Sequence, residues 1–91
     1  MEKITLEMLQ MFIKKLSNDD PDVMVLTGEE GKKYSEYSEG VFYISFEGPF
    51  YEMLNYCPDG GKVYNKLVDY LERHGMWFEF GNAWNISIYN L

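Results

Sequence analysis

The stretch MWFEFGNAWNISIY, residues 76–89, contains two runs in which large apolar side chains alternate with other residues. Such alternation is typical of β-strands, and the break at Gly81-Asn82 predicts a hairpin. A two-residue turn there would pair Phe80 with Ala83 and scatter the apolar set. An odd loop centred on Asn82 pairs Phe80 with Trp84 instead, so the hydrophobic pattern favours the odd loop. It places on one face Met76, Phe78, Phe80, Trp84, Ile86 and Ile88.

Outward from this hairpin, the rest of the chain predicts three helices and two further strands. Helical spacing of apolar residues indicates helices over 6–16, 49–56 and 62–74, with Thr5 as an N-cap and Gly75 as a C-cap. Short runs over 23–26 and 41–47 indicate strands, and 28–40 is expected to be an exposed loop or hairpin. The prediction is one α+β domain over 1–91: a small two-layer fold, with a mostly antiparallel sheet of about four strands and three helices on one face.

The predicted register also defines an outward face of the sheet. Its members are Tyr43, Ser45, Trp77, Glu79, Asn85, Ser87 and Tyr89. Large rings mixed with serine and asparagine are typical of protein-binding surfaces, and the rings lack the cations that accompany base stacking. The alternative is that another element, or a second copy of the chain, covers this face. A homodimer formed through it would itself be a binding function.

A second candidate surface is the acidic stretch 18–39. It contains seven carboxylates and two lysines, which accounts for −5 of the chain's net charge of −7. The acids are Asp19, Asp20, Asp22, Glu29, Glu30, Glu36 and Glu39, with Tyr34 and Tyr37 among them. Such a stretch suits docking on a basic groove of a partner protein. The alternative is a soluble loop whose charge serves only solubility.

Charge and composition exclude several classes of partner. A net charge of −7 disfavours direct binding to nucleic acid and to anionic membranes. No apolar run is long enough to cross a membrane, and the start lacks the apolar stretch of a signal peptide. Cys57 is the only cysteine, so an intrachain disulfide is impossible and a reducing, cytoplasmic location is expected.

Catalytic and metal-binding patterns are weak, so we expect a protein that is not an enzyme and uses no cofactor or metal. Cys57 and His74 could form a nucleophile–base pair, but a buried thiol and a helix-end histidine are the simpler interpretations. Asp59-Gly60-Gly61-Lys62 lacks the full phosphate-loop spacing and predicts a helix entry capped by Asp59. One cysteine and one histidine disfavour zinc, and the acids at 19–22 do not match a calcium loop.

In size, acidity, aromatic content and lack of a catalytic signature, the chain resembles phage-encoded inhibitors of bacterial defence such as anti-CRISPR proteins. The likeness is one of composition. It implies a non-enzymatic inhibitor that occludes a basic, nucleic-acid-binding or regulatory site on a host protein. Two alternatives stay open: an oligomeric sponge or sensor for a nucleotide-like ligand, and a structural assembly module. A sponge needs clustered cations, for which the sequence offers Lys62, Lys66 and Arg73 on one helix.

Overall fold

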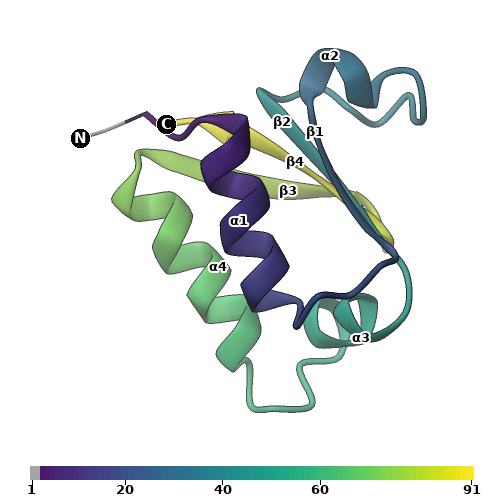
Figure 1. Cartoon of the computed structure of the whole chain (residues 1–91), viewed down its shortest axis with the longest axis vertical. Coiled ribbons are helices and arrows are strands. Elements are labelled where there is room, and N and C mark those ends of the chain that lie inside the picture. The colour runs from purple at the N-terminus through teal and green to yellow at the C-terminus, as the bar shows by residue number, and fades with distance from the viewer. Residues whose placement is uncertain (1–2) are drawn as a thin grey trace.

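A computed structural model describes residues 3–91 and contains one four-stranded sheet with the strand order β1-β2-β4-β3 (Figure 1). Each neighbouring pair of strands is antiparallel. The strands are β1 (Val23–Thr27), β2 (Phe42–Phe46), β3 (Met76–Asn82) and β4 (Asn85–Asn90). The predicted antiparallel sheet of about four strands is confirmed.

Three helices of seven or more residues pack on one face of this sheet, which we call the inner face (Figure 1). They are α1 (Leu6–Leu16), α3 (Pro49–Asn55) and α4 (Lys62–Arg73). A fourth, four-residue helix, α2 (Gly28–Gly31), lies apart from them beyond the far ends of β1 and β2. The α+β class and the three helices predicted on one face are therefore confirmed.

Local capping explains where the two long helices begin. The Thr5 hydroxyl accepts a hydrogen bond from the amide of Met8 at 3.1 Å, which caps α1 as predicted. The Asp59 carboxylate accepts from the amides of Gly61 and Val63, so it caps the entry to α4. Burial alone would raise the pKa of Asp59, but these backbone donors hold its pKa below the ordinary value. The Asp59 carboxylate thus occupies the amides at the start of α4 that could otherwise bind a phosphate.

The start of α3 is capped by a residue that is distant in sequence. Its N-cap, Gly48, has no side chain, and Pro49 has no amide to donate. Asp20, at the end of the α1–β1 turn, accepts the amide of Phe50 through Oδ2 at 3.1 Å and the amide of Asp22 through Oδ1 at 2.9 Å. One of the predicted partner-binding acids therefore ties α3 to β1.

The core lies between the inner face and the helices. From the sheet it receives Val25, Phe42, Ile44, Phe46, Met76, Ile86 and Ile88. From the helices and their approaches it receives Ile4, Leu9, Ile13, Phe50, Leu54, Leu67 and Leu71. Phe12 and Tyr70 stack between α1 and α4 with their ring centroids 3.8 Å apart, which joins the two long helices above the sheet.

The predicted pairing of Phe80 with Trp84 is wrong. Phe80 pairs with Ile86, the ladder is irregular between Phe80 and Asn82, and the strands turn at residues 83–84. Asn85 and Asn82 stabilise this tighter turn, since Asn85 Oδ1 accepts the amide of Asn82 and Asn82 Oδ1 accepts that of Trp84. The observed partner of Phe80 lies two residues beyond the predicted one. Side chains alternate with a period of two, so each residue still points to the face that was predicted for it. Trp84 lies outside the β3–β4 pairing; its carbonyl accepts the amide of Phe46 on β2 at 2.8 Å, and the residue is 40% exposed.

Candidate protein-binding surface

Residues 28–40, which we call the cover segment, fold over part of the outer face of the sheet. The predicted outward face is therefore wrong for Tyr43, Asn85 and Ser87, which are all buried. The expectation of an exposed loop over 28–40 is also wrong in part, because Ser35 and Ser38 within it are buried. The alternative interpretation, that another element covers this face, holds for the part formed by Tyr43, Asn85 and Ser87.

Side-chain hydrogen bonds fix the cover segment to β4. The Ser87 hydroxyl donates to the carbonyl of Tyr37 at 2.9 Å and accepts the amide of Glu39 at 3.3 Å. Asn85 Nδ2 approaches the Ser35 hydroxyl at 3.5 Å, and that hydroxyl accepts the amide of Tyr37 at 3.1 Å. Tyr37 and Glu39 are thus held in place from beneath, although their side chains are exposed.

Close packing explains one glycine within the cover segment and one on β3 beneath it. A Cβ on Gly31 would come within 2.7 Å of the Tyr43 side chain, and one on Gly81 within 2.5 Å of Tyr37 Cβ. Real Cβ atoms do not approach so closely, so α2 rests on Tyr43 and the β3 bulge rests on Tyr37 only because these positions lack a side chain. The glycines allow the cover segment to lie flat on the sheet.

Tyr43 carries one unsatisfied polar atom under the cover segment. Its side chain is fully buried, and its hydroxyl has no hydrogen-bond partner among residues 3–91. A buried hydroxyl without a partner costs roughly 1–3 kcal/mol. Tyr43→Phe should therefore leave the free energy of unfolding unchanged or raise it by about 1 kcal/mol in urea denaturation.

The control for this prediction is Ser38→Ala. The Ser38 hydroxyl is buried and donates to the carbonyl of Gly28 at 2.8 Å, so its removal leaves that carbonyl with only the longer hydrogen bond from the amide of Lys32, at 3.3 Å. We expect Ser38→Ala to lower the free energy of unfolding by about 1–2 kcal/mol. A loss of similar size in Tyr43→Phe would show that the tyrosine hydroxyl is bonded in solution and would refute the prediction.

The uncovered part of the outer face keeps the aromatic character that the sequence predicted. Trp77 on β3 and Tyr89 on β4 stack across the strands, with centroids 4.9 Å apart and planes inclined by 27°. Trp77 is 37% exposed and Glu79 is exposed beside it. The exposed ring of Tyr37 in the cover segment lies at a shared hollow with Tyr89, whereas Tyr34 is exposed but does not line that hollow.

A small hollow of about 180 Å³ lies between the cover segment and the β3–β4 hairpin. The cover segment contributes Tyr37 and Glu39, and the hairpin contributes Glu79 and Tyr89. Ser87, which fixes the backbone of Tyr37 and Glu39, lies at its base. The lining thus combines two carboxylates and two phenol rings and contains no lysine or arginine. A cationic side chain fits this chemistry, because carboxylates attract its charge and rings accept its apolar stem.

The predicted acidic stretch does not form one surface. Asp19, Asp20 and Asp22 precede β1, whereas Glu29, Glu30, Glu36 and Glu39 follow it, so the length of a five-residue strand separates the two groups. Several of these acids have local partners. Asp19 lies 3.8 Å from Lys14, and Glu29 lies 3.8 Å from Lys32. The Thr27 hydroxyl accepts the amide of Glu30 and donates to the Glu30 carboxylate, both at 3.1 Å. Asp20 caps α3, and Asp22, Glu36 and Glu39 are exposed.

The residues considered for catalysis are not brought together. Cys57 lies in the turn before α4 and His74 lies just after its far end, about 18 Å of helix away (Figure 1). Within residues 3–91, no group of three or more histidine, cysteine or carboxylate side chains is placed to hold a metal ion. In the same part of the chain, no helix is long and apolar enough to cross a membrane.

Sequence reasoning missed the serines that hold the cover segment in place. Ser35 and Ser38 carry no periodic signal, and Ser87 was assigned to an exposed face rather than to the anchor beneath Tyr37 and Glu39. The one available signal was the spacing of Gly28, Gly31 and Gly40, since each tolerates no Cβ where it lies. Clustered glycines at the margins of a loop can indicate that the loop packs closely on other backbone.

Compared with models of protein families, with curated proteins and with solved structures, the chain gives no significant match to any of them.

Proposed function

We propose that this protein is a non-enzymatic binding protein that docks on a basic site of a partner protein. The hollow beside Trp77 and Tyr89 receives a lysine or arginine side chain of that partner. The observation that carries the proposal is that Tyr37 and Glu39 of the cover segment line one hollow together with Glu79 and Tyr89 of the hairpin. These two segments lie far apart in the sequence. If the occupied site normally binds nucleic acid or a regulator, docking blocks it, and the protein acts as an inhibitor.

The fixed position of the part of the cover segment that lines the hollow, Tyr37 and Glu39, supports this proposal. Ser87 and Ser35 bond the backbone around Tyr37 and Glu39, so these side chains need little further ordering when a partner arrives. Preorganised groups lose less conformational entropy on binding, which leaves more of the contact energy as affinity. The stacked pair of Trp77 and Tyr89 beside the hollow supplies large rings of the kind that dominate binding energy at interfaces.

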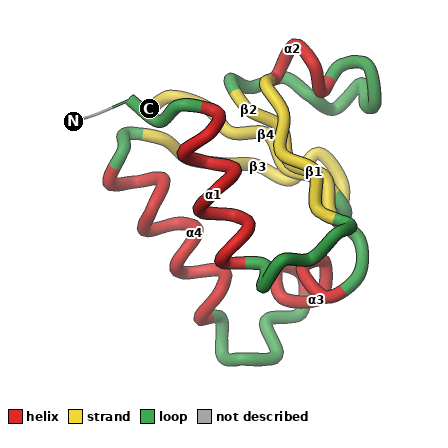
Figure 2. The backbone as a smooth tube through the Cα atoms, viewed as in Figure 1, coloured by secondary structure: helices red, strands yellow, loops and turns green. Residues whose placement is uncertain are grey.

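The charge distribution favours a cationic protein surface over a nucleotide-like ligand. Phosphates in the hollow would meet the carboxylates of Glu39 and Glu79 and find no cation in its lining. The cations that a nucleotide sponge could use, Lys62, Lys66 and Arg73, lie on α4, which packs in the helical layer on the inner face (Figure 2). Trp77 alternates with the inner-face residues Met76 and Phe78, so it and its stacking partner Tyr89 lie on the outer face. The outer face therefore suits a positively charged guest.

A pair of charge-reversed variants tests the proposal. Glu39→Lys with Glu79→Lys changes the net charge by the same amount as Glu7→Lys with Glu72→Lys, whose sites are exposed on α1 and α4. We expect unchanged melting temperatures for both, because exposed charges contribute little to folding. Affinity purification from cell extract should recover a basic protein with the wild type and with the α1/α4 variant, and lose it with the Glu39/Glu79 variant.

Kinetics with the recovered partner provide the sharper measurement. Association should slow at least tenfold in the Glu39/Glu79 variant, because the carboxylates that attract the basic partner are replaced by cations. In the wild type, association should slow with rising salt, because the screening length falls to roughly 8 Å near physiological ionic strength. Equal association rates for the wild type and for both variants would contradict the proposal.

A further inference from the structure

A second surface lies at the opposite edge of the sheet, along β1. Within the described residues 3–91, β1 pairs with β2 alone, and its other side borders a groove of about 520 Å³ beside α1. Gln10, Ile13, Lys14 and Ser17 line the groove on the helix side, and residues 23–26 line it on the strand side. A groove between an edge strand and a helix is the geometry in which a domain can add an extended peptide to its sheet.

The backbone of β1 is available for such pairing. The carbonyl of Val25 accepts the Gln10 side-chain amide at 3.0 Å, so it points away from β2 and into the groove. The amide of Gly28 bonds the carbonyl of Val41 on the other side, which fits the same alternation. The amide and carbonyl of Val25 and the amide of Thr27 therefore face outward, whereas the carbonyl of Thr27, the N-cap of α2, belongs to the first turn of that helix. Gln10, an exposed side chain, stands where the first donor of an added strand would lie.

No residue within β1 prevents the pairing of an added strand. The carboxylates before and after β1 favour a partner segment with positive charges at its ends. The strand Val23–Thr27 contains neither a charge nor a proline, which are the usual protections of a free edge. Asp19, Asp20 and Asp22 lie before it, and Glu29 and Glu30 lie after it. An added segment therefore meets apolar residues along the strand and carboxylates at both ends.

A second copy of this chain is the wrong occupant. Antiparallel pairing of two β1 strands about Val25 would bring the acids that precede β1 in each copy near those that follow it in the other, and parallel pairing would bring identical acids together. Like charges placed opposite one another destabilise a ladder, and each chain carries −7 already. We therefore infer that the edge of β1 accepts an extended segment of a partner protein, with lysine or arginine flanking an apolar centre.

The probe is an acetylated, amidated nonapeptide in which lysine alternates with valine, compared with the same peptide carrying glutamate for lysine. Nuclear magnetic resonance should show the lysine peptide shifting the amides of Val25 and Thr27 and slowing their hydrogen exchange. The glutamate peptide should bind at least tenfold more weakly. Shifts confined to the amides of Glu79 and Tyr89 would show that the peptide binds in the hollow and not at β1. The experiment therefore tests the β1 site and the hollow separately.

Three variants complete the test. Asp22→Lys should weaken the lysine peptide at least fivefold, whereas Asp69→Lys on the exposed face of α4, which changes the net charge equally, should leave its affinity unchanged. Gln10→Ala should strengthen binding roughly two- to tenfold, because one hydrogen bond no longer has to be broken. Binding without protection of Val25 and Thr27, equal affinity for both peptides, or protection of these amides by self-association of the free protein would overturn the inference.

Discussion

Phe46→Ala should lower the free energy of unfolding by about 3–5 kcal/mol, the largest effect of any substitution considered. Phe46 is fully buried at the end of β2, and its ring meets Phe50 of α3 edge-on with centroids 5.7 Å apart. It also lies 6.5 Å from the ring of Phe80 on β3. Truncation leaves a cavity where the sheet joins α3, and neighbouring backbone cannot collapse into it because strand pairing fixes it.

Phe80→Ala is the matched control for this loss. Phe80 touches the same cluster but is 39% exposed, so its removal opens surface rather than a cavity. We expect a loss of about 1 kcal/mol, on the order of that of an ordinary half-exposed substitution. Urea titrations of the two variants should differ in midpoint and share their slope. Equal losses would show that the β2–α3 junction is loosely packed in solution.

Trp77→Ala should weaken binding to the basic partner by at least 2 kcal/mol, which is more than about thirtyfold in the dissociation constant. Trp77 is part-exposed, stacks on Tyr89 and lies outside the core, so its folding role is small. A partner that covers this face would bury the indole fully and remove its remaining contact with water. The melting temperature should fall by only a few degrees.

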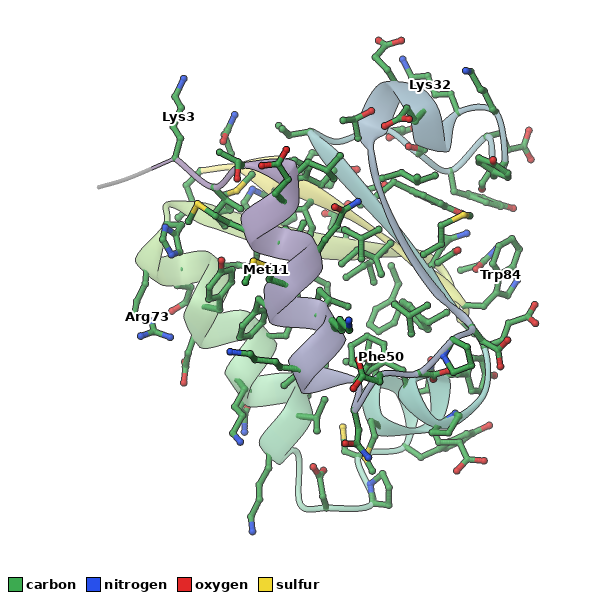
Figure 3. The ribbon with its side chains drawn as sticks, in the orientation of Figure 1. Lys3, Met11, Lys32, Phe50, Arg73 and Trp84 are labelled. Carbon is green, nitrogen blue, oxygen red and sulfur yellow. The ribbon has the colours of Figure 1, made fainter. Side chains whose placement is uncertain are left out.

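Trp84→Ala distinguishes a site from a general need for surface aromatics. Trp84 is 40% exposed, almost the same fraction as Trp77, but it lies in the β3–β4 turn and projects from the edge of the molecule (Figure 3). We expect partner affinity within about twofold of the wild type, on the scale of peripheral interface contacts. Titration calorimetry on both variants measures the difference. Equal losses, or an unchanged affinity in Trp77→Ala, would remove the stacked pair from the proposed interface.

The elements that the sequence predicted well are those whose cause is local. Thr5 lies three residues before the amide that it caps, and the apolar stripe of α1 repeats within eleven residues. The hairpin was predicted on the correct face but in the wrong pairing. Alternation of apolar residues determines which face each side chain points to, but not which residues pair across the strands. The observed pairing depends on the irregularity near Gly81, where the Asn85 side chain accepts the amide of Asn82 and Tyr37 packs close by.

The candidate site could be predicted only as residue types. Tyr37, Glu39, Glu79 and Tyr89 were each singled out, but as members of two separate surfaces. Their meeting depends on hydrogen bonds that span about fifty residues, such as that from Ser87 to the carbonyl of Tyr37. A local pattern carries no information about such contacts. The burial of Tyr43 was missed for the same reason, since Gly31 must first bring α2 onto it.

The place of β4 inside the sheet bears on how the chain acquires its fold during synthesis. Strand β4 comes last of the four in sequence but lies between β2 and β3, and it supplies Ile86 and Ile88 to the core. Until residues 85–90 have been made, β2 lacks one of its two neighbours and the cover segment lacks the Asn85 and Ser87 side chains that hold it. The β2–β4 and β3–β4 pairings and the anchoring of the cover segment therefore all require the last-made strand, and the N-terminal strands cannot complete the sheet before it.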